Sequence, residues 1–130
     1  MAKAKPTPRR SKIITEPPRR SSIGELEPYV AQRVKLILDR MIAAGYDPVV
    51  HEAFRTKTRQ EWLYAKGRTT SGPIVTHTMN SKHLVGKAVD IISRNRGWRW
   101  PEFFNQLHFY AQQFGMYSIP GDACHLEWRG

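Results

Sequence analysis

An aspartate inside an apolar run is the feature of this sequence that most limits how the chain can fold. Asp90 lies within Ala88-Val-Asp-Ile-Ile-Ser93, a β-branched segment that predicts a buried strand over residues 88–93. A carboxylate in such a strand is costly to bury unless it is paired with a polar group or bound to a metal ion. The fold must therefore bring partners to Asp90 from other parts of the chain.

Two histidines are candidates for these partners. His83 lies seven residues before Asp90, and Gly86 between them lets the backbone turn. His125 lies 35 residues after Asp90, in the last segment that predicts a strand. Imidazole and carboxylate are both ligands of Zn²⁺, and catalytic zinc sites keep a fourth position open. The residues fit a zinc site, but they also fit three unrelated polar positions, since the chain has five histidines and a single His is more often structural.

The remaining pattern predicts an α+β domain. Apolar residues at helical spacing predict helices over residues 25–44, 57–66 and 101–114. Alternating or β-branched runs predict strands over residues 48–54, 88–93, 116–119 and 124–128. Because no regular βαβ repeat is present, we expect a small, mainly antiparallel sheet packed with about three helices, with the metal site in a cleft. Residues 68–82 are rich in Gly, Ser and Thr and predict a long loop before His83.

The positive charge is concentrated near the N-terminus. The chain has 130 residues and a net charge of +10, of which residues 1–22 carry +6. This stretch is too polar to offset its ordering entropy, so we expect a flexible basic arm over residues 1–22 and one folded domain over residues 23–130. Cys124 is the single cysteine and allows no intrachain disulfide. No apolar run is long enough for a signal peptide or a transmembrane helix.

The segments that carry the histidines resemble the signature of the M15 zinc peptidases. The pattern Ser81-x-His-x-x-Gly-x-Ala-x-Asp90 is followed by Asp122-x-x-His125. Upstream, Glu52-Ala-Phe-Arg-Thr56, Gln60, Leu63-Tyr64 and Gly67-Arg-Thr69 are similar to the run that precedes this motif in endolysin-type members. The resemblance covers roughly residues 25–130. The family contains D-Ala-D-Ala carboxypeptidases and dipeptidases, and the L-alanyl-D-glutamate endopeptidases that phages use as endolysins.

The resemblance implies a role for each matching residue. His83, Asp90 and His125 would bind one Zn²⁺ per chain, which lowers the pKa of its bound water to about 7. Asp122 would be the catalytic carboxylate, which takes the proton of this water and returns it to the leaving amine. Arg55 would contact the substrate carbonyl and, with the metal, stabilise the oxyanion.

Further residues have weaker assignments. The resemblance implies that Ser81 helps to hold the substrate, and Gln60 is a further substrate-binding candidate. Glu127 is expected on the same strand face as His125, where it either orients that ligand or is a solvated rim carboxylate. Cys124 stands where Pro is common in relatives, and we expect it to be buried on the opposite face of the strand. His51 and His77 are expected to be spectators.

Together these points imply a zinc metallopeptidase that cuts the stem peptide of peptidoglycan. The expected target is the L-Ala–D-Glu bond, with a D-Ala-D-Ala carboxypeptidase or dipeptidase as the near alternative. The expected setting is a monomeric phage endolysin in host lysis. Such a protein would be made in the host cytoplasm and would reach the wall in the periplasm through a membrane lesion made by a partner.

The basic arm leaves room for other classes of function. It could draw the enzyme to anionic cell-envelope polymers, because long-range attraction of this kind raises the encounter rate. It could also follow phosphates in a nucleic-acid-binding protein. No nucleic-acid module is recognisable, and the metal motif has no role there, so nucleic acid is the less expected partner. A non-catalytic wall-binding domain is a third alternative, and Asp122 counts against it.

Overall fold

The structure is a computed structural model that describes residues 15–130. It divides into two compact units. One unit contains residues 20–55 and 80–130, and the other contains residues 56–79 together with residues 15–19 of the described chain. Residues 1–14 of the predicted arm lie outside the described residues, and the arm's boundary at residue 22 stays a prediction.

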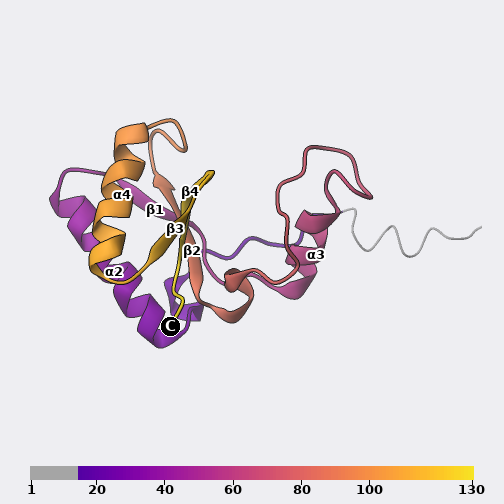
Figure 1. Ribbon diagram of the computed structural model, residues 1–130, viewed down its shortest axis with the longest axis horizontal. Helices are drawn as coiled ribbons and strands as arrows, with labels where there is room; N and C mark the ends of the chain where they lie inside the picture. The colour runs from indigo at the N-terminus through magenta and orange to yellow at the C-terminus, as the bar shows by residue number, and fades with distance from the viewer. Residues whose placement is uncertain (1–14) are drawn as a thin grey trace, which may run out of the picture. The chain divides into compact units, whose positions relative to one another are not determined.

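The larger unit is built on one antiparallel sheet (Figure 1). Its four strands lie in the order β1-β2-β4-β3 and comprise Pro48–Glu52 (β1), Ala88–Ser93 (β2), Tyr117–Ile119 (β3) and Asp122–Glu127 (β4). Its helices are α2 (Pro28–Ala43) and α4 (Pro101–Gln113), with 3₁₀ turns η1 (Ile23–Glu25) and η2 (Lys82–Val85). With α3 in the other unit, the described chain has three α-helices, and the predicted α+β class is confirmed.

The two central strands present chemically different faces. Val89 and Ile91 in β2 and Leu126 in β4 are fully buried in the core, which α2 and α4 also form (Figure 1). Asp90 and His125 lie between these positions and point to the opposite face, because successive side chains of a strand alternate. The register pairs Asp90 directly with His125. Burial of the apolar face therefore sets which polar side chains meet on the other face.

Helix α2 supplies a regular apolar stripe to this core. Its buried residues recur at spacings of three or four: Val30, Val34, Ile37 and Met41. Each such side chain contributes about 1.5–3 kcal/mol on burial. The helix begins at Pro28, so the predicted start at residue 25 was wrong. A residue before proline is disfavoured in helical conformation, and Glu27 is accordingly extended at ψ 133° while its carboxylate caps the backbone N–H of Tyr29.

The other predicted boundaries are close to the observed ones. The predicted strand over 88–93 is confirmed without change, and the helix over 101–114 ends one residue early. The strand over 48–54 ends at Glu52, and the last strand begins at Asp122 instead of residue 124.

Cys124 lies in the core, as expected, and burial raises the pKa of its thiol far above the usual range. No helix among residues 15–130 is long and apolar enough to cross a bilayer.

The smaller unit is organised around α3 (Lys57–Ala65). The hydroxyl of Thr56 caps this helix by accepting a hydrogen bond from the backbone N–H of Arg59. The buried guanidinium of Arg59 lies 2.7 Å from the carboxylate of Glu16 and donates to the carbonyl of Pro17 at 3.0 Å. No helix or strand follows α3 before η2, apart from an isolated bridge at Lys66, so the predicted long loop is confirmed.

Gly86 fixes the path of the turn that carries His83. It adopts a left-handed conformation with φ 71° and ends η2. Its carbonyl accepts a hydrogen bond from the backbone N–H of Glu27 at 2.9 Å. A Cβ at this position would lie 2.9 Å from the same Glu27 nitrogen, a distance that real Cβ atoms essentially never show. Only glycine therefore lets η2 pass so close to the start of α2.

The close approach predicts different costs for alanine at two glycines. Gly97 also has a left-handed conformation, φ 60°, but a Cβ there would meet nothing within 4 Å. Gly97→Ala is expected to lose about 1–2 kcal/mol of unfolding free energy from backbone strain alone. Gly86→Ala is expected to lose about 1–3 kcal/mol more, because it adds the steric clash. Urea denaturation of both variants in chelator measures the difference, and equal losses would contradict this account.

Candidate metal centre

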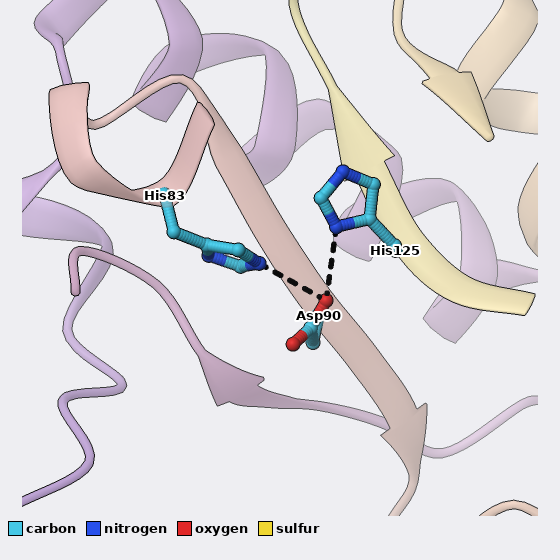
Figure 2. Close-up of side chains that lie close together, drawn as sticks. All are labelled: His83, Asp90 and His125. Atoms are coloured by element: carbon cyan, nitrogen blue, oxygen red, sulfur yellow. Dashed lines mark ion pairs between the residues drawn. The ribbon is translucent and has the colours of Figure 1, made fainter. Parts of the chain in front are cut away.

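Three side chains from three elements converge on the polar face of the sheet (Figure 2). His83 comes from η2, Asp90 from β2 and His125 from β4. Nε2 of His83 lies 3.3 Å from Oδ1 of Asp90, and Nδ1 of His125 lies 3.4 Å from the same oxygen. One ligand atom from each residue lies within 4.8 Å of the other two. Within residues 15–130 this is the one group of three or more His, Cys, Asp or Glu side chains that could hold a metal ion.

A backbone carbonyl sets the proton position on His83. Nδ1 of His83 lies 2.7 Å from the carbonyl oxygen of Ala53, just after β1. Because a carbonyl oxygen only accepts, Nδ1 carries the hydrogen and donates it. In the neutral imidazole Nε2 then carries the lone pair, and Nε2 faces Asp90. This tautomer is one that can bind a metal ion through Nε2.

A carboxylate sets the proton position on His125 in the same way. Nε2 of His125 lies 2.9 Å from Oε1 of Glu127, so Nε2 donates. In the neutral ring Nδ1, which faces Asp90, then carries the lone pair. Glu127 is buried, and Arg129 donates to its other oxygen at 2.8 Å. Burial alone would raise the pKa of Glu127, but the hydrogen bonds from Arg129 and His125 outweigh it and lower that pKa. Glu127 is therefore a buried hydrogen-bond partner of His125, and its role in orienting a metal ligand stays a prediction.

The charges of His83, Asp90 and His125 favour a cation between the three side chains. Nε2 of His83 and Oδ1 of Asp90 are buried, and neither has a hydrogen-bond partner among the described residues. Burial opposes ionisation of Asp90, but the imidazoles of His125 and His83 outweigh this effect and hold its pKa well below the usual range. With neutral rings two acceptors would face each other at 3.3 Å, an arrangement that a proton or a metal ion between them relieves. Ligand atoms at about 2.0–2.2 Å from one tetrahedral ion are separated by roughly 3.3–3.6 Å. The distances from Oδ1 of Asp90 to the two imidazoles, 3.3 and 3.4 Å, fit such an ion.

A proton and a metal ion would compete for Nδ1 of His125. Burial lowers the pKa of His125, but the neighbouring carboxylates of Asp90 and Glu127 outweigh burial and raise it. A metal ion needs the neutral imidazole, so it competes with a proton for Nδ1. His83, Asp90 and His125 therefore form a site that favours a positive charge, either a proton or a metal ion.

The other predicted site residues of this unit lie around the same group. Oδ2 of Asp122, a residue that is more than half exposed, lies 4.0 Å from Nδ1 of His125. Nη2 of the buried Arg55 lies 3.9 Å from Oδ2 of Asp90. Ser81 caps η2, and its hydroxyl accepts a hydrogen bond from the backbone N–H of His83 at 3.1 Å. Ser81 thus has a visible role in shaping the turn, and its contact with substrate stays a prediction.

Some candidates are not part of this group. Gln60 belongs to the smaller unit, where it is fully buried and its amide donates to the carbonyl of Thr78 at 2.6 Å. Its role in substrate binding stays a prediction. The rings of His51 and Trp98 are in edge contact, with centroids 4.8 Å apart.

Sequence reasoning gave no role to Glu52, which forms a bidentate ion pair with Arg55. The signal in the sequence that could have indicated this ion pair was the spacing of three between the opposite charges of Glu52 and Arg55.

Known proteins that resemble the chain include peptidases of the bacterial wall. The peptidoglycan L-alanyl-D-glutamate endopeptidase CwlK of Bacillus subtilis is 37% identical over 69 residues, which are 52% of this chain and 41% of CwlK. The chain thus spans less than half the length of this relative. No protein-family model matches the chain.

Two solved structures are similar along most of the chain. The L-Ala D-Glu endopeptidase ChiX of Serratia marcescens has a TM-score of 0.61 and 21% identity, covering 82% of this chain and 83% of ChiX. A mutant of the vancomycin resistance D,D-pentapeptidase VanY, from a VanB-type cassette and in complex with Zn(II), has a TM-score of 0.63 and 18% identity. That match covers 81% of this chain and 73% of VanY. These likenesses show that the chain has the fold of these peptidases.

Proposed function

We propose that the chain is a zinc-dependent peptidase that cuts the stem peptide of peptidoglycan at the L-Ala–D-Glu bond. The observation that carries this proposal is the convergence of His83, Asp90 and His125, with the carboxylate of the exposed Asp122 4.0 Å from Nδ1 of His125. Two nitrogen ligands and one oxygen ligand are a usual set for catalytic zinc. The similarity to CwlK and the fold shared with ChiX support the choice of substrate and bond.

The surrounding side chains supply what hydrolysis of a peptide bond requires. A bound zinc would lower the pKa of a water to about 7 and polarise the substrate carbonyl. Asp122 is exposed and lies 4.0 Å from Nδ1 of His125, so its carboxylate can take a proton from a water beside the ligands and pass it to the leaving amine. Arg55 adds a permanent positive charge next to Asp90, which favours an oxyanion nearby.

Two substitutions separate metal binding from catalysis. His83→Ala is expected to lose stoichiometric zinc, because it removes a ligand whose lone pair is already oriented. Asp122→Asn is expected to keep zinc and to lose about 10²–10⁴-fold in kcat/KM, the range for a missing general acid–base. Zinc content after dialysis is measured by atomic spectrometry, and kcat/KM on purified muropeptides.

Matched controls exist for both substitutions. His77→Ala changes a histidine of the loop after α3, and Asp39→Asn changes an exposed aspartate of α2. Both controls are expected to behave as the wild type in zinc content and activity. Full activity in Asp122→Asn would remove this residue from the mechanism, and stoichiometric zinc in His83→Ala would remove His83 from the ligand set.

The products of digestion distinguish the proposed bond from its alternative. Cleavage of the L-Ala–D-Glu bond frees a peptide that begins at D-Glu and leaves L-Ala on the glycan. A D-Ala-D-Ala carboxypeptidase frees only a terminal D-alanine. The fold shared with VanY keeps this activity as the alternative. We expect mass spectrometry of digested muropeptides to show the first product. Release of alanine without the longer peptide would favour the alternative.

The biological setting that we propose is host lysis by a phage endolysin. The support is the resemblance of residues 52–69 to endolysin-type peptidases and the net charge of +10, which favours attraction to anionic envelope polymers. In this setting the chain acts as a monomer after a separate partner permeabilises the membrane. Nucleic acid is a less favoured partner, because the metal ligands have no role in binding it.

Addition of the protein to permeabilised Gram-negative cells tests this setting. Lysis is expected without chelator and not with it, because the ligands then lose their metal. The rate is expected to fall as salt rises from about 0.05 to 0.5 M, since screening shortens the reach of the positive charge. Turbidity is the readout, and small soluble muropeptides in higher salt are the control for loss of intrinsic activity. Salt-dependent DNA retention without lysis would support the nucleic-acid alternative instead.

A further inference from the structure

Glu52 and Arg55 form a buried ion pair next to the metal ligands. Nε of Arg55 donates to Oε2 of Glu52 at 3.1 Å, and Nη2 donates to Oε1 at 2.7 Å. Glu52 is 3% exposed and Arg55 is 8% exposed. Two parallel hydrogen bonds between planar groups fix the orientation of the guanidinium as well as its position. Glu52 therefore determines where the charge of Arg55 lies.

A bulge in β1 places Glu52 on the face of the sheet that carries the ligands. Val50 pairs with Ile91, but Glu52 pairs with Asp90, so the register shifts by one residue at His51. Residues directly opposite one another in a sheet share a face, and Glu52 therefore lies on the face of Asp90. A bulge of this kind re-aims a side chain, and bulges are frequent beside functional sites.

The guanidinium of Arg55 lies between two carboxylates but is closer to one of them. Its Nη2 is 2.7 Å from Oε1 of Glu52 and 3.9 Å from Oδ2 of Asp90. The other oxygen of Asp90, Oδ1, faces the two histidines. A direct Arg55–Asp90 pair would compete with a metal ion for the same carboxylate, because both are cations. The hold of Glu52 on Arg55 works against that competition.

We propose that Glu52 is a positioning residue that keeps Arg55 at 3.9 Å from Asp90, too far for a hydrogen bond between the two. By doing so it keeps Oδ1 of Asp90 available to a metal ion shared with His83 and His125. Arg55 stays beside the site as a fixed positive charge. This inference rests on the metal site of the proposed function, but it concerns metal affinity and not which bond is cut.

Zinc affinity in two variants tests the proposal. In Glu52→Gln the acceptor charge is lost and Arg55 can turn to Asp90, so the zinc Kd is expected to rise about 10–100-fold. In Glu52→Gln/Arg55→Gln the competing cation is gone, and the Kd is expected to return to within about threefold of the wild type. Activity is expected to stay low in the double variant, because Arg55 is absent. Competition with a fluorescent zinc chelator measures the Kd without any substrate.

A remote ion pair provides the matched control. Arg20 and Glu25 form an exposed pair at 3.0 Å, and Glu25→Gln removes the same charge as Glu52→Gln. Its zinc Kd is expected to be unchanged. Circular dichroism verifies folding of every variant. If Glu52→Gln does not fold, Glu52→Asp replaces it, because the shorter carboxylate keeps the charge but not both hydrogen bonds. A smaller rise in Kd is then expected.

The outcomes separate this inference from the proposed function. A wild-type Kd in Glu52→Gln, or in Glu52→Asp where that variant is used, would overturn the role of Glu52 while leaving the metal site intact. A double variant that binds zinc no better than Glu52→Gln would also overturn it, since a merely structural defect predicts no recovery. If the wild type itself binds no zinc, both the proposed function and this inference fail.

Discussion

The arrangement of the larger unit depends on one buried carboxylate that faces two imidazoles. Asp90 lies in a strand whose neighbours are apolar, and both imidazoles approach the same oxygen and help to hold its pKa low. A hydrogen bond on the far side of each ring, to the Ala53 carbonyl or to Glu127, orients the ring and leaves the other nitrogen toward Asp90. The backbone after β1, the turn η2 and the end of β4 are all held by these bonds. The local structure is consistent only if a positive charge lies among the three residues.

The sheet keeps this polar group apart from the core although both use the same two strands. Val89, Ile91 and Leu126 face the helices, and the candidate ligands Asp90 and His125 occupy the alternate positions. Cys124 lies where the core and the polar group approach each other. It packs in the core, its thiol donates to Oδ1 of Asp122 at 3.6 Å, and it is not part of the group that could hold a metal ion.

The sequence predicts features that show a short repeat of apolar residues, and features in which burial of a charged side chain costs much free energy. The β-branched run predicts β2 without error, and the cost of burying Asp90 predicts that it has polar partners. The choice of His83 and His125 as these partners came from the resemblance to the zinc peptidases. The start of α2 was missed because the preference for helix was extended through Glu27, whose conformation Pro28 restricts. The bulge at His51 could not be predicted, because it depends on pairing with a strand about 40 residues away. The face of the sheet on which Glu52 lies could not be predicted for the same reason, although its spacing of three from Arg55 indicated the ion pair.

The separation of the two faces has a consequence for how this scaffold can change. Side chains on the ligand face contribute little to the apolar core, so they can be exchanged with limited effect on helix packing. The fold is shared with an L-Ala D-Glu endopeptidase and with a D,D-pentapeptidase at about 20% identity. A sheet that carries its chemistry on one side and its stability on the other is a platform on which new specificities can be selected while the fold is retained.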